Sequence, residues 1–126
     1  MSFYLLWAAA LVCFVSVYVH GVWGRRLYTG FLGDSNLPER EKAVSYVSWD
    51  VFTVMLAVSG LALVYVAYNL SALIIVYPIM AMHLGGAAVF VLLIARGHRT
   101  LLRLPGAFLM GGTGLLILLA QLQEIP

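Results

Sequence analysis

The chain has 126 residues, of which 63% are hydrophobic and 10% are charged. Soluble domains are about half apolar and about a quarter charged, so this composition argues against a water-soluble globular fold. The net charge of +2 is small, and nothing in it points to a nucleic-acid partner. We expect a single domain over residues 1–126 whose surroundings are the lipid bilayer.

Four apolar runs follow one another along the chain, each close to the roughly 20 residues that a helix needs to cross the hydrocarbon. Because every backbone amide in hydrocarbon must be paired within its own segment, these runs are expected to be helices. The sequence predicts an all-α integral membrane bundle of four transmembrane helices, up-down-up-down, with spans at about 3–23, 46–68, 72–95 and 104–122. No basic residue precedes the first run and no clear cleavage site follows it, which favours a retained helix over a signal peptide.

The seven basic residues all lie in two segments between the spans, at 24–45 and 96–103. Cytoplasmic loops are enriched in Lys and Arg, so both segments are predicted to be cytoplasmic. Both termini are then periplasmic, in a bacterial inner membrane. Within the first loop, Ser35 or Asn36 is expected to cap a helix that starts near Pro38.

Proline and glycine occur within the last two spans. Pro78 removes one backbone hydrogen bond, so a kink is predicted in the third span. Small residues let helices approach closely in lipid, and the two glycine groups comprise Gly85, Gly86, Gly111, Gly112 and Gly114. They predict close packing of the third span against the fourth or against another chain. The alternative is that they leave space for a ligand beside His83.

Ionisable groups within membrane spans are costly and mark candidate sites. Cys13, Ser16 and His20 are spaced three and four residues apart, so they share one helix face in the first span. Asp50 is expected at a similar depth in the second span, on one face with Thr53. We interpret His20 and Asp50 as a pair that locks two helices, binds a proton or supplies two metal ligands. A metal would need further ligands, and His98 lies too far along the chain to be counted.

His83 lies near the middle of the third span, one turn after Met80. With Cys13, Met55 and Met110 elsewhere in the bundle, it could form a soft copper(I) site, although methionines at helical spacing are usually packing residues. Haem between His20 and His83 is disfavoured, because their expected depths differ by several residues at about 1.5 Å each. The single cysteine excludes an internal disulfide and dithiol redox chemistry. The cofactor, if any, is therefore left open, with a transition metal favoured over haem.

Three stretches resemble small bacterial four-helix integral membrane proteins of an uncharacterised family. They are "VHGVWGRRL" at the end of the first span, "LPEREKAVSYVSWDVFTVML" entering the second, and "FLMGGTGLLIL" in the fourth. Together they cover about a third of the chain. The resemblance implies the four-helix fold and no activity.

Three functions remain in competition. The first is a non-enzymatic accessory or binding subunit with a polar His/Asp site near the cytoplasmic face. The second is a small proton- or cation-linked transporter or channel, and the third is a metal- or haem-binding electron carrier. An enzyme is not expected, because the sequence holds no nucleophile–base–acid set or phosphate loop. Four helices bury little polar machinery alone, so we expect a homo-oligomer or a subunit of a larger membrane complex.

Overall fold

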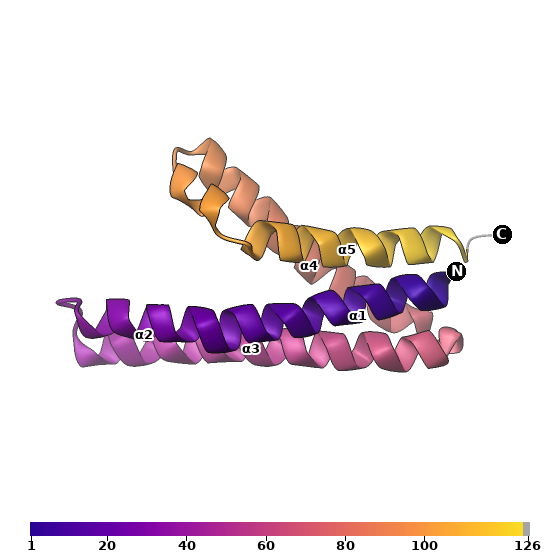
Figure 1. The fold of residues 1–126 in the computed structure, drawn as a ribbon, viewed down its shortest axis with the longest axis horizontal. Helices are drawn as coiled ribbons and strands as arrows, with labels where there is room; N and C mark the ends of the chain where they lie inside the picture. The colour runs from indigo at the N-terminus through magenta and orange to yellow at the C-terminus, as the bar shows by residue number, and fades with distance from the viewer. Residues whose placement is uncertain (125–126) are drawn as a thin grey trace.

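A computed structural model describes residues 1–124, which form helices and short connections only. The first helical run extends without a break from Ser2 to Gly33 and has three parts (Figure 1). These are α1 (Ser2–Tyr18), the π-helical segment η1 (Val19–Gly24) and α2 (Arg25–Gly33). The loop expected over 24–45 is therefore wrong over its first ten residues, 24–33, which continue the helix. A charged residue marks the edge of an apolar run, but it does not end a helix whose backbone bonds continue.

The second helix, α3, runs from Glu39 to Tyr68, so its predicted start near Pro38 is confirmed. The predicted cap is wrong, because Pro38 itself occupies the capping position and no side chain bonds the helix start. The Ser35 hydroxyl instead donates to the carbonyl of Leu32, at 2.7 Å, and closes the end of α2. Glu39 and Glu41 lie in the first turn of α3, where the helix dipole favours negative charge.

Pro78 does not kink the middle of a helix. After α3 the chain forms a 3-10 segment, η2 (Leu70–Ile75), and then α4 (Val76–Ala95). Pro78 is thus the third residue of α4, just after the junction with η2, and α4 continues past it to Ala95. The irregular backbone precedes it, at Ala72 (φ −92°, ψ 17°).

The second basic loop is tightly ordered. Gly97 follows α4 with φ +104°, a conformation that glycine adopts without strain. The N–H of Gly97 donates to Ile94 at 3.0 Å, and the N–H of His98 donates to Leu93 at 3.1 Å. This pair of bonds is the Schellman arrangement, which satisfies the last carbonyls of a helix. A second 3-10 segment, η3 (Arg99–Arg103), then leads into α5 (Gly106–Leu122).

The helices do not pack in a symmetrical square. α1 lies between α3 and α5 and contacts both extensively, whereas α4 packs on α5 and shares few contacts with α3. Figure 1 shows α1 and α3 as a long antiparallel pair, with α4 and α5 diverging from it away from the termini. The fully packed core lies near the terminal end of the molecule, where ten buried apolar residues cluster: Leu6, Ala9, Ala10, Cys13, Leu63, Val66, Ala67, Val76, Ile117 and Ala120.

Glycines set the closest helix approaches. A Cβ atom on Gly114 would lie 2.6 Å from Leu84, and one on Gly86 would lie 2.0 Å from Met110. A Cβ atom on Gly111 would only touch Ala87, at 3.7 Å. These three of the five predicted glycines face the contact between α4 and α5. Gly85 and Gly112 have no atom within 4 Å of a Cβ position, so they do not take part in it.

Three helical runs are long and apolar enough to cross a membrane: Ser2–Gly33, Glu39–Tyr68 and Leu70–Ala95. The fourth, α5, is apolar but has 17 residues, about 26 Å at 1.5 Å per residue. The Ser2 hydroxyl donates to the Glu124 carboxylate, so the two ends of the described chain meet. Both basic loops lie at the opposite end of the molecule (Figure 1).

A candidate binding cleft beside His20

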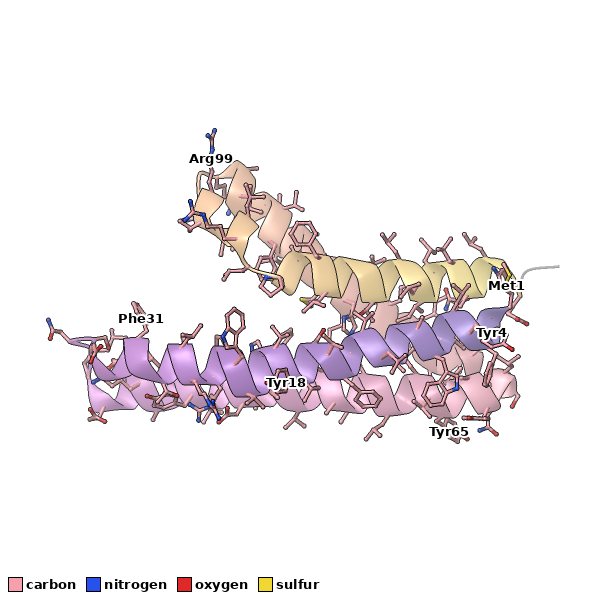
Figure 2. All side chains as sticks on the ribbon, viewed as in Figure 1. Met1, Tyr4, Tyr18, Phe31, Tyr65 and Arg99 are labelled. Carbon is pink, nitrogen blue, oxygen red and sulfur yellow. The ribbon has the colours of Figure 1, made fainter. Side chains whose placement is uncertain are left out.

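A cleft of about 880 Å³ separates the two halves of the molecule at the end that carries the basic loops. One wall comes from η1, α2 and α3, and the other from the far end of α4, η3 and the start of α5. Its lining is almost wholly apolar and includes six aromatic side chains: Trp23, Tyr28, Phe31, Trp49, Phe52 and Phe90. Figure 2 labels Phe31 near the tip of the first wall and Arg99 at the tip of the second. The cleft is therefore an apolar, aromatic space that opens at the edge of the bundle.

His20 contributes an imidazole to this cleft, held by α3. The ring stacks on Trp49 with 4.0 Å between centroids and meets the edge of Phe52 at 5.0 Å. Its Nδ1 lies 2.9 Å from the Thr53 hydroxyl oxygen. The same hydroxyl lies 3.2 Å from the Trp49 carbonyl, so Thr53 links the imidazole to the backbone of α3.

The π-helical segment explains how His20 reaches this position. A π turn has an extra residue and leaves backbone groups free for other partners. The indole Nε1–H of Trp49 donates a hydrogen bond to the His20 carbonyl, at 3.1 Å. Gly21 and Gly24 allow η1 to approach α3 closely. A Cβ atom on Gly21 would lie 2.6 Å from Thr53, and a Cβ atom on Gly24 would lie 3.1 Å from Trp49.

Asp50 does not pair with His20. Its carboxylate forms a two-pronged ion pair with Arg25, with Oδ1 2.8 Å from Nε and Oδ2 3.0 Å from Nη2. The same guanidinium lies 4.7 Å above the ring of Tyr46. The continuation of the helix past Gly24 places Arg25 against α3, and the fork of a guanidinium matches a carboxylate better than an imidazole does. The Asp50 side chain is 54% exposed, which places the pair on an outer surface.

The predicted stripe of Cys13, Ser16 and His20 divides between two places. Ser16 lines the deep part of the cleft, and its hydroxyl donates to Val12 in its own helix, at 2.7 Å. Cys13 lies deeper, and its Sγ is 3.7 Å from Nε2 of His83, on α4. The stripe thus links the cleft to a buried contact between Cys13 and His83, two residues that the sequence grouped in a soft-metal site without predicting a direct contact.

The predicted metal ligands are dispersed. Within residues 1–124, no three histidine, cysteine, aspartate or glutamate side chains gather closely enough to hold a metal ion. His20 faces Thr53, Asp50 faces Arg25, and His83 faces Cys13. His98 is exposed at the start of η3 and does not line the cleft.

Sequence reasoning missed the cleft itself. Its signal was present, since five of the six aromatic residues occur in the two short stretches "WGRRLYTGF" and "WDVF". Aromatic residues near basic ones are typical of membrane interfaces, so they were interpreted as interfacial residues. The cleft was missed because its lining forms only when separate helices come together. The role of Arg25 was missed because it was assigned to a loop.

No protein-family model matches this chain, and neither the curated proteins nor the solved structures contain a significant match. The resemblance to small bacterial four-helix membrane proteins therefore stays a prediction.

Proposed function

We propose that this chain is a four-span membrane protein of the non-enzymatic binding or accessory kind, with basic loops in the cytoplasm and termini in the periplasm. The seven-to-none distribution of basic residues supports this orientation, because both basic loops lie at one end of the molecule. α5, at 17 residues, is at the lower end of what a spanning helix requires. It can span where neighbouring helices and a locally thinner bilayer accommodate it.

The aromatic cleft is the feature from which we infer a ligand. In this orientation it opens at the level of the inner leaflet, where lipid chains and headgroups meet. Lipid-facing apolar space of 880 Å³ is filled by acyl chains, because no hydrogen-bonding wall would hold water there. The ligand class that we propose is an anionic phospholipid with its chain in the cleft.

The charge at the cleft opening supports an anionic headgroup. η3 contributes Thr100 and Leu101 to the lining and also carries Arg99 and Arg103, both exposed. Basic side chains at a cytoplasmic surface attract anionic lipid, at about 1 kcal/mol each. The nearest acidic side chain on α3, Asp50, is held by Arg25 and does not oppose them. The imidazole of His20, in the cleft lining, adds a polar group to the largely apolar wall.

Tryptophan quenching tests the proposal. Trp23 and Trp49 line the cleft, whereas Trp7 packs near Tyr68 at the terminal end, with 6.1 Å between rings. In a Trp7→Phe background, phosphatidylglycerol with brominated chains should quench the fluorescence at a lower mole fraction than brominated phosphatidylcholine. The double variant Arg99→Gln/Arg103→Gln should remove that preference. Arg40→Gln, in the other basic loop, is the matched control for loss of charge and should retain it.

Two outcomes would contradict the proposal. Equal quenching by both lipids would mean ordinary boundary lipid without headgroup selection. Absence of quenching, combined with pH-dependent flux in liposomes that Asp50→Asn removes, would favour the transporter instead.

A further inference from the structure

The contact between Cys13 and His83 joins two residues 70 positions apart in a fully buried part of the bundle. Both side chains are 0% exposed, and Sγ lies 3.7 Å from Nε2. Within residues 1–124, Nδ1 of His83 has no hydrogen-bond partner. A thiol–imidazole hydrogen bond satisfies only one ring nitrogen and is weak. A buried polar atom without a partner costs free energy, which a plain packing residue at position 83 would avoid.

The separation of the two atoms suits a shared metal ion. Typical metal–nitrogen and metal–sulfur distances are about 2.0 and 2.3 Å. With the observed 3.7 Å between the ligand atoms, these distances give an angle of about 120° at the metal. This is the angle of trigonal coordination, so the pair is preorganised for two of three ligands.

The absence of nearby acidic side chains within residues 1–124 favours a monovalent over a divalent metal ion. All five acidic residues of the chain are exposed, so none can compensate charge at the buried pair. One thiolate, one neutral imidazole and one monovalent cation make a site without net charge, whereas Zn²⁺ would leave one positive charge in an apolar core. Soft thiolate and thioether ligands favour Cu(I) among the monovalent ions available to proteins.

Met110 is the thioether that packs against α4, the helix that carries His83. Its side chain is 5% exposed and lies in the groove left by Gly86, one turn from His83 on α4. Met110 and Ser16 also line the cleft, and Ser16 is one turn from Cys13. The cleft therefore brings the thioether and the helix turn beside the thiol to one surface.

We propose that Cys13, His83 and Met110 form a Cu(I)-binding site between α1, α4 and α5. Binding converts the Cys13 thiol to a thiolate and releases one proton, while Nε2 of His83 coordinates as a neutral ligand. No electron transfer is involved. The site shares Met110 with the cleft lining, but its test does not depend on the lipid proposal, because its ligands do not include Arg99, Arg103 or His20.

A competition titration tests the site. Purified protein in mild detergent is titrated anaerobically with Cu(I) buffered by bathocuproine disulfonate, and one Cu(I) per chain is expected. Cys13→Ser should weaken binding by more than about 100-fold, since loss of even outer-shell partners costs about 10- to 100-fold. Met110→Leu should weaken it less. Met55→Leu, on the exposed side of α3, is the matched control and should leave the affinity unchanged.

X-ray absorption on the unaltered protein keeps the test independent of any folding defect in the variants. The proposal expects scattering from both sulfur and imidazole nitrogen around copper. Failure to compete with the chelator would overturn the site, as would bound copper without sulfur neighbours or a Cys13→Ser variant that binds as tightly as the original chain. Stoichiometric Zn²⁺ in place of Cu(I) would overturn the charge argument.

Discussion

The two ends of this molecule are built from different side chains, and they differ in how closely the helices pack. At the terminal end, small residues such as Ala9, Ala10 and Gly60 let helices meet closely, and leucine and isoleucine fill the remaining space. At the loop end, large rings and an arginine–aspartate pair join α2 to α3, but the second pair of helices stands apart. The closed end holds the packed core, and the open end holds the aromatic cleft.

The largest expected effect lies at the closed end. Leu63 is fully buried in the core on α3, whereas Leu61 on the same helix is 63% exposed. Leu63→Ala leaves a cavity and should destabilise the fold by about 2–5 kcal/mol. Leu61→Ala, measured alongside by thermal unfolding in detergent, should change stability little. Similar losses from both variants would show that the core described here does not dominate stability.

Gly112 and Gly114, both on α5, test how closely α5 packs against α4. Gly114→Ala would place a methyl group 2.6 Å from Cγ of Leu84 and 3.2 Å from its backbone nitrogen. Neither atom is the free end of a side chain, so the helices must shift, at a cost of about 1–3 kcal/mol. Gly112→Ala has open space and should be neutral or slightly stabilising. A lower melting temperature for the Gly112 variant than for the Gly114 variant would reverse the assigned interface.

The smallest effect is expected at the open end. Asp50→Asn breaks the ion pair with Arg25, whose side chain is 31% exposed and whose partner is 54% exposed. Ion pairs in such surroundings contribute less than about 1 kcal/mol. Salt should weaken the contribution further in the original chain and have no such effect in the variant. A loss as large as that of Leu63→Ala would mean that the pair is buried in the assembled protein.

The sequence predicts the helices well because apolar length is a local property. The runs and the helix start beside Pro38 depend on neighbours within a few turns, and the short connection between α4 and α5 brings their glycines to one contact. The errors concern partners. Asp50 was paired with His20 because Arg25 was read as loop, and Pro78 was read as a kink because the preceding 3-10 segment has no signature of its own. The contact between Cys13 and His83 depends on how α1 crosses α4, which no local pattern encodes.

The unbroken run from Ser2 to Gly33 has a mechanical consequence. Its 32 residues measure about 48 Å, against about 30 Å of hydrocarbon, so the run is longer than the hydrocarbon is thick. Its first half packs in the core through Leu6, Ala9 and Ala10, and its second half lines the cleft through Leu27 and Phe31. No turn separates the two halves, so the position of the packed core fixes the position of this wall of the cleft.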